Sequence, residues 1–335
     1  MNVLISLHKG YGLGDAVQMS AVLRHVKKYR PHWIVDFQAE EGRECVGRGH
    51  CANVFNYGTP YPHNHYNAEV QILLYDTICN YHDKPNTRVV SCLHERFDIP
   101  WDRECAKYEI EVSERAMEAA AILTTPNYKQ RKRDNELDNK VVALHYKGDS
   151  SQSRKDLTHQ QAETICRLIE SMGSTPLLLD WRNVSPLTDK LNVRTTGRIP
   201  TSKRWGADIE MNCAVISSCR AFIGIDSGPS KCASATETPS LVVWTGHHPT
   251  QFHDPAHNTT HLVPVDYKGL YPEITDRKVL DWFETNYNVR FYTGDPVDSI
   301  RTWLEETLSE KLSMSTTTEN SRTAEARRRH RRHDG

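Results

Sequence analysis

The residues that most directly suggest chemistry form the loop Gly224-Ile225-Asp226-Ser227-Gly228-Pro229. The loop lies between an apolar run at 221–225, which predicts a buried strand, and residues 230–236, which predict a short helix. Glycine lets a ligand approach the backbone, and the free amides at the start of a helix, with its dipole, favour an anion. The pattern predicts a phosphate or diphosphate site. From the residues alone, a plain turn in which Asp226 caps the helix is an equally good interpretation.

Two further sets of residues could act together with this loop. Gly14 and Asp15 precede an apolar helix, and a carboxylate there could take a proton from a hydroxyl group as general base. Alternatively, Asp15 only caps that helix, with Gln18 three residues on. Arg154 and Lys155 follow the first strand of the second half, and either cation could compensate the charge of a departing diphosphate. Taken alone, such a pair more often is simply solvated.

The elements that must position Asp15 form a recognisable unit. Residues 3–7 are a short apolar run followed by three closely spaced glycines, which predicts a buried strand that leaves its sheet through a glycine-rich turn. An amphipathic helix follows until Pro31, and residues 33–37 predict a second strand. This strand–helix–strand order favours a parallel sheet with its ligands at the carboxyl ends of the strands.

The middle of the first half is less regular, and the pattern then restarts. Residues 45–103 contain one clear strand, at 70–74, and are otherwise loop-like, where acceptor recognition is expected. A helix at 114–123 leads into a charged linker, 128–136. Beyond it the expected strands are 140–144, 176–180, 221–225 and 240–244, and the expected helices are 159–172, 211–217, 230–236 and 298–312. A second doubly wound domain is the natural interpretation.

The segment from Asn212 to Pro255 resembles the donor-site core of glycosyltransferase family 9, the heptosyltransferase-like enzymes. About forty residues agree in order and spacing, including the loop at 224–229 and the run Thr238-Pro239-Ser240-Leu241-Val242-Val243-Trp244-Thr245-Gly246. The resemblance implies the GT-B fold, with two Rossmann-like doubly wound domains facing a central cleft. It also implies an inverting transfer of a sugar from a nucleoside-diphosphate donor to an acceptor hydroxyl.

The resemblance also implies roles for individual residues. In the family, a Gly-Asp loop carries the proposed general base, which corresponds to Gly14 and Asp15. The diphosphate would be held by the residues that match the family's donor motifs: Lys155 with its neighbour Arg154, Asp226, Ser227, Gly228, Pro229 and, as an additional charge, Lys231. Further candidates for the cleft are His145, Lys147, Trp181, Asp208, Gly246 and His247, and Asp208 would reach the ribose or base.

Two departures from the family pattern put the donor's identity in doubt. Lys231 stands where the family commonly has histidine, and Asp156-Leu157 follows the phosphate lysine where the family has tryptophan. The match is thin over residues 45–103, so the acceptor is open.

Several residue clusters could in principle hold a metal. Cys45, His50 and Cys51 are close in sequence, but the nine cysteines include no Cys-x-x-Cys pair and their number is odd, so reduced thiols are expected. His247-His248 and His253-Asp254 also could bind a metal. Since GT-B enzymes neutralise the diphosphate with amides, a helix dipole and lysines, we interpret these histidines as cleft residues. We therefore expect no metal and no cofactor besides the nucleotide-sugar substrate.

Length and charge set the remaining expectations. The 335 residues fit two domains, at 1–135 and 136–312, whose last helix could return to the first domain. The tail 313–335 reads as disordered, and from Arg322 onward six arginines against two acidic residues give about +4, although the whole chain has a net charge of -1. No signal peptide or span of 18 apolar residues occurs, so a cytoplasmic location is expected. Two variants of this location stay open: a peripheral position at the inner membrane, and the cytoplasm of an infected host if a phage encodes the protein.

The tail leaves two acceptor classes open. Its arginines would steer the protein toward an anionic cell-surface glycan such as lipopolysaccharide, or toward DNA carrying a modified base, as in phage DNA glycosylation. A different class of function also stays open. Because fold does not determine function, the chain could be a GT-B-fold nucleotide-sugar epimerase or a non-catalytic nucleotide-sugar or nucleic-acid binder.

Overall fold

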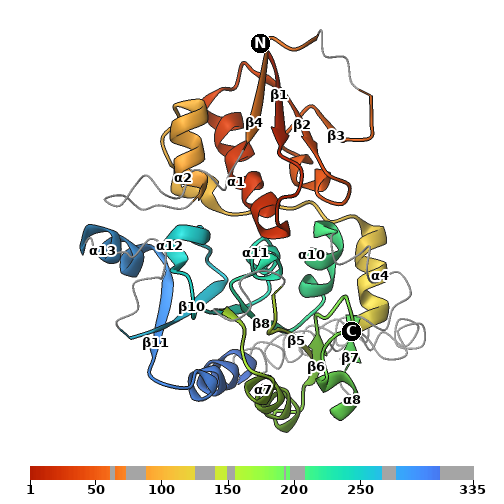
Figure 1. The fold of residues 1–335 in the computed structure, drawn as a ribbon, viewed down its shortest axis with the longest axis vertical. Coiled ribbons are helices and arrows are strands. Elements are labelled where there is room, and N and C mark those ends of the chain that lie inside the picture. The colour runs from red at the N-terminus through yellow and green to blue at the C-terminus, as the bar shows by residue number, and fades with distance from the viewer. Residues whose placement is uncertain are drawn as a thin grey trace, which may run out of the picture.

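The computed structural model describes residues 1–60, 65–72, 88–124, 140–148, 155–191, 194–196, 208–265 and 277–309. In this part of the chain each half builds one parallel β-sheet with helices packed against it, and the two sheets lie one above the other in Figure 1. The expected pair of doubly wound domains is therefore confirmed. The predicted linker, Arg154 and the tail 313–335 fall outside the described residues.

The first sheet consists of β1 (Asn2–Leu7), β2 (Ile34–Ala39), β3 (Asn53–Asn56) and β4 (Ala68–Ile72). Its strand order is β3-β2-β1-β4, and all three pairings are parallel. The chain therefore changes direction across the sheet between β1 and β4. In open parallel sheets, ligands bind in the crevice beyond the carboxyl ends of the strands at such a reversal.

The helices of the first half include α1 (Leu13–Tyr29), whose buried face covers the sheet. The others are the 3₁₀ turn η1 (Glu44–Gly47), α2 (Arg88–Cys92) with the π turn Leu93–Phe97, α3 (Arg103–Ala106) and α4 (Glu114–Thr124). The expected helices at 15–30 and 114–123 are thus present. The expected cap is wrong, because Gly12 is the N-cap residue of α1 and no side chain caps it. Gln18 instead donates to the carbonyl of Gly14 at 3.3 Å.

The second sheet is the larger and is parallel throughout the described residues. Its order is β11-β10-β9-β8-β5-β6-β7, so the reversal falls between β5 and β8. Its strands are β5 (Val141–His145), β6 (Thr175–Leu178), β7 (Arg194–Thr195), β8 (Ala221–Ile225), β9 (Ser240–Val243), β10 (Thr259–Pro264) and β11 (Asn288–Tyr292). The loop at 224–229 therefore leaves the sheet at its switch point.

Helices cover both faces of the second sheet. On the face toward the first sheet lie α10 (Ile209–Ser217) and α11 (Gly228–Ser234), whereas α7 (His159–Ser171) and residues 297–309 pack on the other face. The last helix thus stays on its own sheet instead of returning to the first. Shorter helices are α8 (Leu187–Lys190) and α12 (Pro249–Phe252), and α13 (Arg277–Asn286) precedes β11.

Two helices start in ways that elementary rules explain. In α7, Thr158 and Gln161 form a reciprocal capping box. Helix α11 begins at Gly228, two residues earlier than predicted, because Pro229 is well suited to the first turn of a helix. No helix within the described ranges is long and apolar enough to cross a membrane.

Direct contacts join the two halves. Helices α1 and α11 pack against each other, and α4 packs against α10. Ion pairs add to this contact, with Arg48 Nη1 2.8 Å from Glu210 Oε2 and Lys107 Nζ 2.6 Å from Glu237 Oε1. One apolar cluster runs through residues of both sheets, so the junction is part of the packed interior.

Candidate functional site

The two switch points face each other across the junction of α1 and α11. A Cβ atom added to Gly14 would lie 3.0 Å from Lys231 Cδ and 3.3 Å from Gly228 Cα. One added to Gly228 would lie 2.6 Å from Leu13 Cδ2 and 3.1 Å from the backbone nitrogen of Gly14. Both positions therefore exclude a side chain. The first turns of the two helices meet directly, which brings the Gly14-Asp15 loop and the loop after β8 together.

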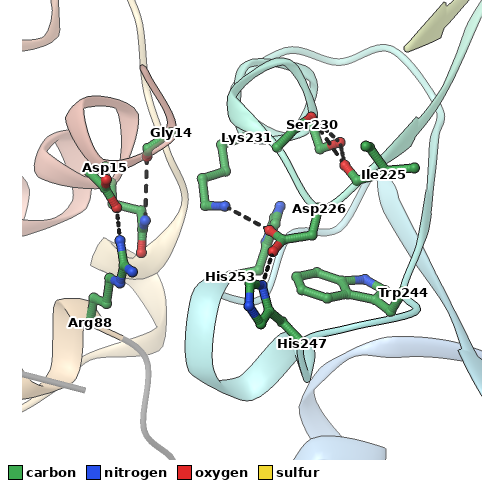
Figure 2. Close-up of polar contacts among 12 residues, drawn as sticks. Gly14, Asp15, Arg88, Ile225, Asp226, Ser230, Lys231, Trp244, His247 and His253 are labelled. Carbon is green, nitrogen blue, oxygen red and sulfur yellow. Dashed lines mark hydrogen bonds and ion pairs between the residues drawn. The ribbon is translucent and has the colours of Figure 1, made fainter. Parts of the chain in front are cut away.

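Asp15 does not cap α1 but forms a partly buried ion pair. Its Oδ1 accepts a charge-assisted hydrogen bond from Nη1 of Arg88, the first residue of α2 (Figure 2). Arg88 is 7% exposed, and its guanidinium carbon lies 4.9 Å from the centre of the Phe252 ring. Burial lowers the pKa of Arg88 to about 10. The sequence carries no signal for this residue, because it lies in the irregular stretch of the first half.

Asp226 holds two partners on the opposite side of the junction, as Figure 2 shows. Its Oδ1 lies 3.3 Å from Lys231 Nζ, and its Oδ2 lies 2.7 Å from His247 Nδ1. Burial alone would raise the pKa of the Asp226 carboxyl, but Lys231 and the His247 hydrogen bond hold it well below its usual range. The His247 ring in turn stacks on Phe252, with the ring centres 4.3 Å apart. Asp226 therefore orients a lysine and a histidine; the helix N-cap is Ser227.

Three cationic side chains converge at this junction. Lys155 is 8% exposed and Lys231 is 5% exposed, and burial lowers the pKa of both ammonium groups. Lys155, Lys231 and Arg88 are close enough for each lysine to feel the guanidinium as a like charge, while Asp226 attracts all three. Holding cations together away from water is unfavourable. An anionic ligand at the junction would offset this cost.

The loop after β8 supplies neutral donors beside these cations. The hydroxyl of Ser227 lies 3.0 Å from His145 Nδ1 and donates to the carbonyl of Ile225 at 3.1 Å. Burial, with the nearby Lys155 charge, lowers the pKa of His145 to about 4, so the imidazole is neutral at neutral pH. Within the described residues, no protein group accepts a hydrogen bond from the amides of Ser227 and Gly228. These amides remain available to an anion.

Other predicted site residues lie in different surroundings. Trp181 is buried and donates from Nε1 to Asn212 Oδ1 at 3.0 Å, which makes it part of the interior. Asp208 is the N-cap of α10, where its Oδ1 accepts from the amide of Met211 at 3.0 Å. Lys147 is exposed, and Gly246 is buried directly before His247.

The potential metal ligands are dispersed. Among the described residues, no group of three or more histidine, cysteine or acidic side chains could hold a metal ion. Cys45 is a buried free thiol. His253 and His261 belong to an aromatic cluster with Trp244 and Tyr287. Burial lowers the pKa of His253 to about 4.

Comparison with solved structures identifies the fold. Among 22 matching chains is the Escherichia coli ADP-heptose lipopolysaccharide heptosyltransferase II, with a TM-score of 0.60 and 11% identity over 93% of this chain and 99% of that one. The E. coli heptosyltransferase WaaC with ADP matches with a TM-score of 0.51 and 12% identity over 85% and 100%. TibC, an iron-containing dodecameric glycosyltransferase from enterotoxigenic E. coli, matches with a TM-score of 0.52 and 15% identity over 92% and 79%.

These matches establish the GT-B fold for this chain, as the sequence resemblance implied. No protein-family model matches the chain, and no curated protein sequence matches it. At such low identity the likeness concerns the fold, so function has to be argued from the junction itself.

Proposed function

We propose that the chain is a glycosyltransferase that moves a sugar from a nucleoside-diphosphate sugar to an acceptor hydroxyl, with inversion at the anomeric carbon. The observation that carries the proposal is the convergence of Lys155, Lys231 and Arg88 where the first turns of α1 and α11 meet. A diphosphate is the common biological anion that matches several cations and a row of free amides. The fold shared with ADP-heptose-using enzymes supports this donor class.

The donor would lie with its diphosphate at the start of α11. The amides of Ser227 and Gly228 and the ammonium of Lys155 would bind its oxygens. The ammonium of Lys231 would add a positive charge near the diphosphate, while its ion pair with Asp226 keeps the lysine in place. Preorganised cations and amides of this kind stabilise the charge that develops on a leaving group. In this proposal they do so without a metal ion.

Asp15 would be the general base. The acceptor oxygen would form a bond to the anomeric carbon while its proton passes to an Asp15 carboxylate oxygen. On the opposite face of the sugar, the bond from the anomeric carbon to the diphosphate oxygen would break. Its electron pair would leave with the nucleoside diphosphate, whose charge the lysines and amides would stabilise. The contact between Gly14 and Gly228 supports this arrangement, because it puts the α1 loop beside the donor loop.

The acceptor that we propose is a cell-surface glycan. Its support is the fold shared with a lipopolysaccharide heptosyltransferase. DNA is the competing class, suggested by the arginine-rich tail 313–335, which lies outside the described residues. Deletion of residues 313–335 separates the two. Loss of salt-dependent DNA binding together with loss of transfer to DNA would favour DNA, whereas unchanged transfer to a glycan would favour the glycan.

A panel of nucleoside-diphosphate sugars, ADP-heptose first, tests the reaction itself. The wild-type protein should release the nucleoside diphosphate from at least one donor, and Asp15→Asn should abolish this turnover while donor binding persists. Asp281→Asn, an exposed carboxylate on α13, is the control and should behave as wild type. Donor binding without turnover in both the wild type and Asp15→Asn would indicate a nucleotide-sugar binder. Conversion of the donor sugar to its epimer would indicate an epimerase.

A further inference from the structure

The ion pair between Arg88 and Asp15 affects how the proposed base can work. Both side chains are largely withdrawn from solvent, with 9% and 15% of their surfaces exposed. A guanidinium that touches a carboxylate stabilises its charged form, and burial keeps salt from screening the interaction. Asp15 is therefore held ionised but is a weak base in this state. A reaction that needs Asp15 to accept a proton must first weaken its contact with Arg88.

The surroundings of Arg88 indicate what could weaken that contact. Its guanidinium contacts Asp15 and lies over the ring of Phe252, on which His247, the partner of Asp226, also stacks. Lys155 and Lys231, which are proposed to hold the diphosphate, are close enough to Arg88 to feel its charge. The charged or titratable groups close enough to act on Arg88 come from several elements: Asp15 in α1, Tyr11 before α1, Tyr108 before α4, Lys155 before α7, Asp226 before α11 and Lys231 in α11. His247 after β9 and Asp254 after α12 act on these neighbours, His247 on Asp226 and Asp254 on Lys231.

We propose that Arg88 is a positioning residue that couples donor binding to the strength of the base. In this scheme, which rests on the proposed function, the guanidinium pairs with Asp15 in the free protein and turns toward the diphosphate when the donor binds. Arginine suits this task because its planar fork carries five donors and can contact two anions at once. The Phe252 face supports the guanidinium in both positions through cation–π contact.

The order of events follows from this exchange. Without a donor, the Asp15 carboxylate stays paired with Arg88 and deprotonates neither an acceptor nor water. Once the diphosphate draws the guanidinium away, the carboxylate becomes basic enough to take the acceptor proton. The acceptor oxygen then bonds to the anomeric carbon, and the electron pair of the breaking bond leaves with the diphosphate, which Arg88 now helps to stabilise. The donor should therefore bind first.

The test compares Arg88→Gln, Arg88→Lys and the control Arg30→Gln. Arg30 also places a guanidinium over an aromatic ring, 5.8 Å from the centre of Trp33, and donates to the carbonyl of Phe97 at 2.9 Å, but it is remote from Asp15. The measurements are the donor Kd, the pH dependence of kcat/KM for the donor, and the pH dependence of kcat. The pH profile of kcat/KM reports on the free protein, and the pH profile of kcat reports on the donor complex.

The acidic limb of a profile is the pH range in which the rate falls as Asp15 takes up a proton. In the wild type, the acidic limb of kcat should lie at higher pH than that of kcat/KM, because Arg88 has left Asp15 in the donor complex. Removing the cation should move the acidic limb of kcat/KM in Arg88→Gln upward by about 1–3 pH units, because Asp15 then takes up a proton more readily. The donor Kd should rise about 10- to 100-fold. Arg88→Lys keeps the charge, so its limb should stay near the wild-type position while kcat falls. Arg30→Gln should leave both limbs in place.

The possible outcomes separate the two proposals. If the wild type turns over a donor in an Asp15-dependent way but Arg88→Gln shows an unmoved acidic limb, the coupling is wrong and the proposed function stands. If Arg88→Gln does not fold, Arg88→Lys decides. This variant keeps the positive charge, so the acidic limb of its kcat/KM profile should not move. A shift to higher pH by about 1–3 units, the shift expected for loss of the charge, would overturn the coupling. If the wild type turns over no donor, both proposals fail together.

Discussion

Substitution of Gly228 by alanine tests whether the site lies where α1 meets α11. The added Cβ would be 2.6 Å from Leu13 Cδ2, which can rotate away. It would also be 3.0 Å from Leu13 Cβ and 3.1 Å from the backbone nitrogen of Gly14, which cannot. The first turn of α1 must then retreat by about 0.4 Å to restore an ordinary contact. Overpacking of this kind costs about 1–3 kcal/mol. We expect the melting temperature to fall by roughly 2–8 °C.

The effect on catalysis should be larger than the stability loss explains. Displacing α1 moves Asp15 away from the donor loop, and misplacement by about 1 Å costs on the order of 100-fold in rate. For the smaller shift here we expect about a tenfold loss in kcat/KM at a temperature where the variant is fully folded. The assay is donor turnover, with folding checked by circular dichroism at the same temperature.

Gly173→Ala is the matched control. Gly173 ends α7 with a φ of 72° and has no heavy atom within 4 Å of an added Cβ, so alanine there is strained by its backbone alone. The cost is about 1 kcal/mol or slightly more, similar to that at Gly228. We expect this variant to lose stability and to keep its turnover. Equal turnover in Gly228→Ala and Gly173→Ala would refute a site at the helix junction.

Three other predictions follow from single contacts. Lys155→Met should weaken binding of a nucleoside diphosphate about 10- to 100-fold by calorimetry, whereas Lys140→Met, directly before β5, should not. Tyr108→Phe removes a buried hydroxyl 3.1 Å from Asp254 Oδ2 and should cost about 1–3 kcal/mol in urea unfolding; an unchanged midpoint would contradict this contact. Because the folded-state pKa of His253 is about 4, below the unfolded value near 6.5, the unfolded chain takes up protons first as the pH falls. Stability should therefore decline from about pH 6.5 toward pH 4, and a flat profile there would show that this histidine is not buried as described.

Local patterns in the sequence were sufficient to predict the strands on either side of both switch points and the loops that leave them, but not β3, β7, β10 and β11. The apolar runs that became β1, β5 and β8 are buried on both faces, so they stand out without any knowledge of packing. Strand β10 was missed because Thr259, Thr260 and His261 interrupt its apolar pattern, although all six of its residues except Pro264 are buried. The hydroxyl of Thr259 and Nδ1 of His261 find their partners in Ser234 and Trp244, which are 25 and 17 residues away along the chain, and a local pattern does not reveal such contacts.

The candidate site shows the same division. The glycines at 14 and 228 and the cations at 155 and 231 could be predicted from motifs, but Arg88 could not. Its partner Asp15 lies 73 residues away, and only the packing of α2 against α1 brings them together. From the residues alone, Asp15 was better explained as a helix cap, which the structure does not show, and only the family resemblance favoured the role of a base. Trp181, which the resemblance suggested for the cleft, is buried and donates to Asn212, and no local pattern predicts that contact.

A crystal structure with a bound nucleoside diphosphate would test the central claim most directly. The diphosphate oxygens should lie within hydrogen-bonding distance of the amides of Ser227 and Gly228 and of Lys155 Nζ, with the Asp15 carboxylate facing the position of the transferred sugar. A nucleotide bound elsewhere, or a diphosphate at this junction with Asp15 turned away from it, would contradict the account.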